Sequence, residues 1–154
     1  MHRYTATVTW ARDGAPFTDL RYSRAHRWRF DGGVDVLASS SPQHVRVPLS
    51  DPAGVDPEEA LVAALSSCHL LSFLYVAAKR GFTVDDYADE AEGVMGKNEQ
   101  GRLAITRVVL RPRVTYVEAP DAATEAAMHH EAHEECYIAN SVRTEVVVEP
   151  VPAA

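Results

Sequence analysis

The feature that most constrains this chain is a predicted helix over residues 57–80 that is apolar on nearly every face. Asp56 can cap it, Pro57 suits its first position, Glu59 stands three residues after the cap, and Gly81 is a stop signal. Its apolar residues are Leu61, Leu65, Leu70, Leu71, Phe73, Leu74, Val76 and Ala77. A helix that is apolar all round must be buried all round. In so short a chain a sheet can cover one side, and we expect a partner subunit to cover the rest.

The segments around this helix read mainly as strands. Alternation and β-branched residues predict strands over residues 3–10, 20–30, 34–38, 88–97, 103–118 and 141–148. Asp31-Gly32-Gly33 and Asn98-Glu99-Gln100-Gly101 provide hairpin turns. Pro120-Asp121 opens a second helix that should run to about Ala139. This order of elements, without repeat or linker, predicts an α+β fold in a single domain over residues 1–154.

Composition narrows the classes of function. Hydrophobic residues at 46% and charged residues at 24% are typical of a soluble globular protein. The formal net charge of −7 argues against a nucleic-acid partner, which would need a positive surface. The first residues do not resemble a signal peptide, and no apolar stretch looks long enough to cross a bilayer. We therefore expect a cytoplasmic protein with no membrane contact.

The chain has two cysteines, Cys68 and Cys136, which is too few for a disulfide-stapled secreted domain. They are either buried packing residues or a dithiol with chemistry. Burial as a small hydrophobe is the default for Cys68 on its helix. The start of that helix lies three turns back, so its dipole cannot activate the thiol. A reactive Cys68 would need a cation from elsewhere in the fold.

Histidines near both cysteines leave two further interpretations open. His129, His133 and Cys136 share one face of the second predicted helix, a set of ligands that zinc uses, although a fourth ligand is not evident. The alternative is that the histidines are half-exposed and that Cys136 faces the core. His69 follows Cys68 directly, but the two point about 100 degrees apart on a helix, so a Cys–His hydrolase is a weaker option.

An arginine-rich segment, residues 22–29, lies on a predicted strand. Alternation places Tyr22, Arg24, His26 and Trp28 on one face and Arg27 and Arg29 on the other. The default is a solvated face, because an inward arginine without a carboxylate partner would be costly.

Taken together, these motifs resemble the OsmC/Ohr family. They are Pro57-Glu58-Glu59, Ala63-Ala64-Leu65-Ser66-Ser67-Cys68-His69, His133 to Cys136-Tyr137-Ile138-Ala139-Asn140-Ser141-Val142, Tyr22-Ser23-Arg24-Ala25-His26 and Ile105-Thr106-Arg107-Val108. The resemblance implies an intertwined α+β homodimer whose central helices are enclosed by sheets of both chains. It also implies a thiol peroxidase that reduces organic hydroperoxides and needs no cofactor beyond an external dithiol, such as a lipoyl group.

By the same resemblance, Cys68 corresponds to the peroxidatic cysteine, Cys136 to the resolving cysteine and Glu58 to the family's glutamate. Arg24 is the best match to the activating arginine, with Arg27 as a competitor. A guanidinium would favour the Cys68 thiolate, and Glu58 would hold that guanidinium in a bidentate pair.

The spacing of Glu58 and Cys68 has a consequence for this cluster. Ten residues of helix separate them by about 15 Å at 1.5 Å per residue. One arginine cannot easily contact both on the same helix, so we expect Glu58 to come from the partner subunit.

The Cys68-His69 form, followed by Leu70-Leu71-Ser72-Phe73-Leu74, resembles a less defined branch of the family. The main rival function is therefore a binding protein that keeps the dimer and its apolar pocket but carries small acidic or lipid-like ligands.

Overall fold

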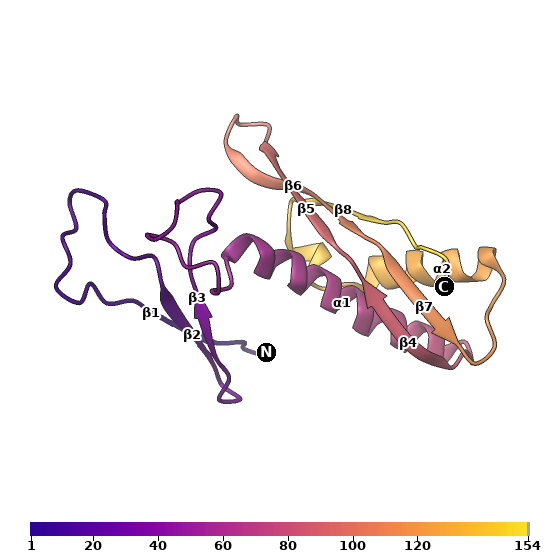
Figure 1. The fold of residues 1–154 in the computed structure, drawn as a ribbon. Helices are drawn as coiled ribbons and strands as arrows, with labels where there is room; N and C mark the ends of the chain where they lie inside the picture. Colours follow the sequence, from indigo (N-terminus) through magenta and orange to yellow (C-terminus); the bar gives the residue numbers. More distant parts are fainter. Residues whose placement is uncertain (154) are drawn as a thin grey trace. The chain divides into compact units, whose positions relative to one another are not determined.

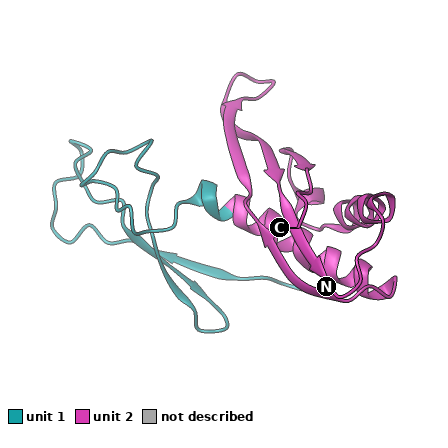
Figure 2. Cartoon of the chain, turned by 45° about the vertical axis from the view of Figure 1, so that its right-hand side comes forward, with its two compact units in different colours: residues 1–60 teal, residues 61–154 magenta. Residues whose placement is uncertain are grey.

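The structure is a computed structural model that describes residues 1–153. The chain divides into two compact units, Met1–Ala60 and Leu61–Ala154, which are called unit 1 and unit 2 (Figure 2). The boundary lies inside helix α1 (Pro57–Lys79), so this one helix belongs to both units. The fold is α+β, as expected. A single domain remains a prediction.

Unit 1 is built on a small antiparallel sheet of β1 (Ala6–Thr9), β2 (His26–Phe30) and β3 (Asp35–Ala38). The expected turn at residues 31–33 is confirmed, since Gly33 adopts a φ of 89° and Phe30 and Val34 are hydrogen-bonded across it. The prediction of a strand over residues 20–25 is wrong. Leu20 has a φ of 64°, and the Arg24 amide donates to the carbonyl of Leu49 in a loop instead of to a neighbouring strand.

Unit 2 contains most of α1 and all later elements (Figure 1). These are β4 (Val84–Asp89), β5 (Glu92–Lys97), β6 (Leu103–Leu110), β7 (Pro112–Tyr116), α2 (Ala122–Glu135), the 3-10 helix η1 (Ala139–Ser141) and β8 (Glu145–Val148). β4 pairs with β7 in one antiparallel sheet. In the other sheet β6 lies between β5, which is antiparallel to it, and β8, which is parallel to it.

Residues 88–97 and 103–118, each expected as one strand, are both interrupted. The break falls between β4 and β5 on one side and between β6 and β7 on the other. Pro112 has no amide hydrogen for the ladder, and the Asp89 side chain accepts the Arg111 amide at 2.6 Å. A side chain thus takes a hydrogen bond that a neighbouring strand would otherwise make, and the long hairpin divides into two sheets.

Local chemistry fixes both ends of α1. The Glu59 amide donates to the Asp56 carboxylate at 2.8 Å and the Asp56 amide donates to the Glu59 carboxylate at 2.7 Å, which is a reciprocal capping box. At the other end Gly81 has a φ of 84°, a conformation that favours glycine. The predicted boundaries of this helix are confirmed to within one residue.

The core of unit 2 forms two clusters along α1. One cluster joins α1 to α2 and β7, with Phe73, Val76, Ala77, Val114, Met128 and Ala132 buried. The other joins α1 to β6 through Leu65, Val108 and Leu110. The opposite side of α1 is an exposed, uncharged face of residues 63, 64, 67, 71, 74, 75 and 78, called the α1 stripe. Within it Leu71 is 65% exposed and Tyr75 60%.

By length and composition α1 could cross a membrane, so the expectation that no segment is long enough is wrong. The core helix of a soluble protein passes the same test. Two polar contacts tie α1 into unit 2: Ser66 donates to Asp89 of β4, and His69 is hydrogen-bonded to His129 of α2. These contacts are those of a core helix.

Candidate active site

Cys136 lies just beyond α2, at its C-terminal cap. The helix was expected to continue to Ala139 but ends at Glu135, because the Asn140 side chain donates to the carbonyls of Glu134 and Cys136 at 2.8 and 3.1 Å. Cys136 is 1% exposed, and the Ala139 amide donates to its sulfur at 3.4 Å. Burial, together with the neighbouring Cys68 side chain, raises the pKa of the Cys136 thiol to about 11.

Cys68 lies on α1, is partly exposed and, like Cys136, is a free thiol. It is a neighbour of Cys136, whose pKa it helps to raise, although 68 positions separate the two cysteines in the sequence. Unit 2 therefore holds a reduced pair of thiols, one partly open and one buried.

The three side chains considered for zinc do not share one helical face, since Cys136 has left the helix. His129 is 3% exposed and uses Nδ1 to contact Nε2 of His69 at 3.1 Å. Residues 1–153 contain no group of three or more histidine, cysteine or acidic side chains arranged to hold a metal ion. The expectation that the histidines are half-exposed is wrong for His129.

His69 and His129 form a buried pair between α1 and α2. His69 is completely buried, and the two rings stack with centroids 5.4 Å apart. Burial lowers the pKa of both histidines to about 4; His133 lowers that of His69 further, and Asp89 raises it. Both imidazoles are neutral at pH 7. One ring nitrogen therefore donates an N–H in the hydrogen bond between them, and the other accepts it.

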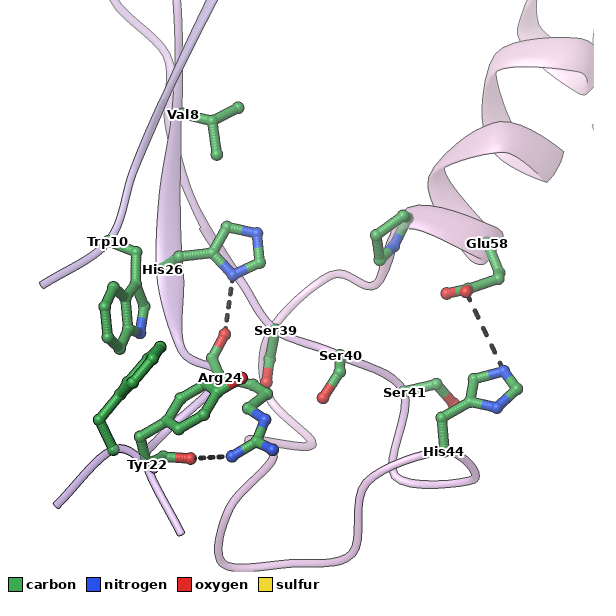
Figure 3. A pocket seen from close by; sticks show the side chains of 12 residues that line it. Val8, Trp10, Tyr22, Arg24, His26, Ser39, Ser40, Ser41, His44 and Glu58 are labelled. Carbon is green, nitrogen blue, oxygen red and sulfur yellow. Dashed lines mark hydrogen bonds and ion pairs between the residues drawn. The ribbon is translucent and has the colours of Figure 1, made fainter. Parts of the chain in front are cut away.

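Unit 1 has a cavity of about 570 Å³. It is lined by Val8, Trp10, Phe17, Tyr22, Arg24, His26, Ser39, Ser40, Ser41, His44, Pro57 and Glu58. Figure 3 shows Trp10, Tyr22 and Arg24 on one side and Glu58 with His44 on the other. Phe17 stacks on Tyr22 at 4.6 Å between centroids, which gives the cavity an aromatic wall.

Arg24 provides the cation of this cavity. Its guanidinium carbon lies 3.7 Å from the centroid of the Tyr22 ring, and Nη1 donates to the carbonyls of Tyr22 and Leu20. These contacts fix the guanidinium plane, while Nε and Nη2 make no hydrogen bond within the described residues.

Arg27, the competing arginine, does not line the cavity. Its Nε pairs with Asp35 at 2.7 Å, and Arg29 pairs with the same carboxylate at 2.8 Å. Arg24, which the sequence pattern placed on the opposite face from Arg27, is the arginine that lines the cavity.

Glu58 lines the cavity but does not form the expected bidentate pair with Arg24. Its Oε1 lies 4.0 Å from Nε2 of His44. Its Oε2 is buried and has no hydrogen-bond partner among residues 1–153, and Ser40 Oγ is in the same condition. The cavity thus presents a cation and unpartnered oxygen atoms together with apolar walls.

The four candidate residues therefore fall into two groups, Cys68 with Cys136 in unit 2 and Arg24 with Glu58 in unit 1. The places of Phe17 and His44 in the cavity and the pairing of His69 with His129 were not predicted from the sequence. For the histidine pair, the sequence signalled only that His69 would be buried, because it lies on a helix predicted to be buried.

Residues 50–151 match the family described as OsmC-like protein. The chain belongs to the OsmC-like family. An OsmC-like protein of unknown function from Vibrio cholerae has a structure similar to this OsmC-like chain, with a TM-score of 0.95 and 55% identity over 98% of this chain and 100% of that one.

Two more distant structures share the fold alone. An organic hydroperoxide resistance protein from Elizabethkingia anophelis has a TM-score of 0.72 and 15% identity, and covers 99% of this OsmC-like chain and 96% of its own. The organic hydroperoxide resistance protein OhrB of Bacillus subtilis has a TM-score of 0.63 and 22% identity, with 97% and 98% covered. No curated protein sequence matches the chain.

Proposed function

We propose that this protein is a thiol peroxidase that reduces organic hydroperoxides to alcohols, with Cys68 as the peroxidatic cysteine and Cys136 as the resolving one. The observation that carries the proposal is that these two free thiols are neighbours in the fold. Their environments suit different roles. Cys68 is partly exposed and can meet a peroxide, whereas the raised pKa of buried Cys136 keeps it protonated and out of competition at neutral pH.

The reaction has three steps. The Cys68 thiolate attacks one peroxide oxygen, the O–O bond breaks, and the alkoxide takes a proton and leaves as an alcohol, so that Cys68 becomes a sulfenic acid. The Cys136 thiol then displaces the hydroxyl group, which leaves as water, and a Cys68–Cys136 disulfide forms. An external dithiol, such as a lipoyl group, donates two electrons and two protons and restores both thiols. No bound cofactor takes part, and we place the reaction in the cytoplasm.

The cavity of unit 1 supports a hydrophobic peroxide as substrate. Its aromatic wall of Trp10, Phe17 and Tyr22 suits an apolar group. Arg24 offers Nε and Nη2, which would orient the peroxide oxygens and favour a thiolate. Hydrogen peroxide has no apolar group to pack against this wall, so the cavity should favour an organic peroxide.

A homodimer would bring the two groups of residues together. The α1 stripe is an uncovered apolar helix face in a single chain. Glu58 and Cys68 lie ten residues apart on α1, or about 15 Å along its axis, which is too far for one arginine to contact both. We therefore assign Arg24 and Glu58 of one subunit to the site of Cys68 in its partner.

The second candidate is a carrier of small acidic or lipid-like ligands. One observation favours it: no cysteine lines the cavity of unit 1, all of whose lining residues are described. A carrier would bind its ligand there without any turnover of peroxide.

Peroxide consumption decides between the two. We expect the wild type to consume cumene or tert-butyl hydroperoxide with dithiothreitol or dihydrolipoamide, faster than hydrogen peroxide. Cys68→Ser should fall to the background rate because it lacks the nucleophile. Cys136→Ser should still undergo one oxidation of Cys68 but accumulate a sulfenic or over-oxidised cysteine. Equal rates for the wild type and Cys68→Ser would overturn the peroxidase proposal and leave the carrier.

A further inference from the structure

The buried pair of His69 and His129 has no part in the chemistry proposed above, yet it lies beside the two thiols. His69 directly follows Cys68 on α1. His129 lies on α2, and Cys136 caps the end of the same helix. The histidine pair is therefore a contact across the α1–α2 interface, and Cys68 neighbours Cys136 at the end of α2.

Apart from these pairs, the buried contacts across this interface are apolar. Phe73, Val76 and Ala77 of α1 pack with Met128 and Ala132 of α2. Contacts of this kind are non-directional, and they resist a small slide of one helix along the other only weakly. A hydrogen bond between two buried rings is directional, because it requires one nitrogen of each helix to face the other within a narrow range.

Burying this pair is costly compared with apolar side chains. Nδ1 of His69 and Nε2 of His129 are buried without a hydrogen-bond partner in the described part of the chain. An unpartnered buried polar atom destabilises a fold. Two leucines would avoid that cost, so the pair is not explained by stability. A buried polar pair can instead specify one arrangement of packed helices, as a single core asparagine does in coiled coils.

The dithiol is the feature that needs such an arrangement. A disulfide forms only when the two Cβ atoms approach to about 3.5–4.5 Å. Cys136 lies beyond the end of α2, so its position depends on where that helix ends relative to α1. The histidine pair contacts both helices close to this point.

We propose that the hydrogen bond between His69 and His129 is a positioning element, which sets the register of α1 on α2 and so keeps Cys68 and Cys136 close together before oxidation. This role rests on the dithiol of the proposed function but does not require that the protein reduce peroxides.

The test measures the equilibrium of the dithiol with glutathione. In this exchange Cys68 and Cys136 lose two electrons and two protons and form the S–S bond, while one oxidised glutathione becomes two reduced molecules. Acid quenching, alkylation and mass spectrometry give the equilibrium constant. No peroxide is present, so a wild type without peroxidase activity would overturn the proposed function and leave this measurement valid.

Three variants separate positioning from stability. His69→Gln keeps a donor close to the place of Nε2, and its equilibrium constant should stay within about threefold of the wild type. The double variant His69→Leu with His129→Leu removes both polar partners, and it should be at least as stable to heat. Its equilibrium constant should nevertheless fall about tenfold or more. If it does not fold, His129→Phe, which keeps a ring beside Phe73 but has no ring nitrogen, should show the same fall.

A second polar contact between the same segments is the control. Arg80, just after α1, pairs with Glu131 of α2 at 2.6 Å, but both side chains are partly exposed. Arg80→Gln with Glu131→Gln should leave the equilibrium constant unchanged, since exposed pairs contribute little. A wild-type constant in a folded variant that lacks the histidine bond would overturn the proposal. So would an equal fall in the control.

Discussion

Unit 1 and unit 2 differ most in how they bury apolar side chains. Unit 2 has two clusters of buried residues along α1. Among the described residues of unit 1, Ala38 is the only buried apolar one, while Val8, Trp10, Phe17, Leu20, Phe30, Val34 and Val47 are all exposed. A segment of 60 residues without a core cannot maintain its own structure.

This difference matches the division of the candidate site. Unit 2, which has a core, holds the two neighbouring thiols, and their relative position depends on its packing. The unit without a core holds the cavity with Arg24 and Glu58. A partner subunit that covers unit 1 would complete both its fold and the site, so that dimerisation and activity depend on the same contacts.

The largest effect is expected from a charge in the α1 stripe. Leu71→Asp should convert the dimer to monomers and abolish peroxidase activity, because an unpaired carboxylate cannot be buried in an apolar interface. Unit 1 should lose hydrogen-exchange protection and unit 2 should keep it.

The matched control is Leu103→Asp, since Leu103 is 69% exposed and Leu71 65%, but Leu103 lies at the start of β6. It should remain dimeric and active in sedimentation and turnover assays. A dimeric, active Leu71→Asp protein would show that the stripe is not the interface.

The second prediction uses mixed dimers, isolated by two different affinity tags. A dimer of one Cys68→Ser chain and one Glu58→Ala chain has one intact site if the site is shared. It should therefore show about half the activity of the wild-type dimer, well above both parents. A dimer of Cys68→Ser with Cys136→Ser should not exceed its Cys136→Ser parent, because both thiols of a site come from one chain. Equal behaviour of the two mixed dimers would exclude sharing.

The sequence predicted best where a structure depends on neighbouring residues. The capping box of Asp56 and Glu59 and the turn at Gly33 depend on contacts within a few positions. Predictions failed where a distant or unexpected side chain intervened. Asp89 takes the amide of Arg111, 22 positions away, and Asn140 ends α2 by capping its last carbonyls. No periodicity in the strands or in the helix signals either contact.

The same distinction applies to the candidate site. Alternation correctly separated Arg24 from Arg27, even though residues 20–25 are not a strand. The resemblance to the family named both cysteines, but their closeness in the fold had to come from the structure. His69 and His129 are 60 positions apart, and nothing in a single sequence connects them.

The third prediction compares the two arginines. Arg24→Ala should lower kcat/KM about 10- to 100-fold, since a charge-assisted hydrogen bond contributes about 1.5–3 kcal/mol. Arg27→Ala should stay within about twofold, because Arg27 pairs with Asp35 outside the cavity. Steady-state kinetics with one organic hydroperoxide measures both. A larger loss for Arg27→Ala would reverse the assignment.

The smallest effect concerns the pH dependence of stability, and it should come from unit 2. Burial lowers the pKa of His69 and His129 from 6.5 to about 4 in the folded chain. Between these values the unfolded chain binds more protons, so the free energy of unfolding should fall as pH drops from 6.5 to 4. Each histidine contributes at most about 1.4 kcal/mol per pH unit. Above about pH 7.5, where the unfolded histidines are also neutral, the pair adds almost no pH dependence. Urea unfolding of the wild type and of His69→Leu with His129→Leu should therefore differ in slope only in this acid range, because other titrating groups, such as Asp35 and Asp121, are common to both. Parallel curves for the two proteins from pH 6.5 to 4 would show that the histidines are not buried as neutral rings.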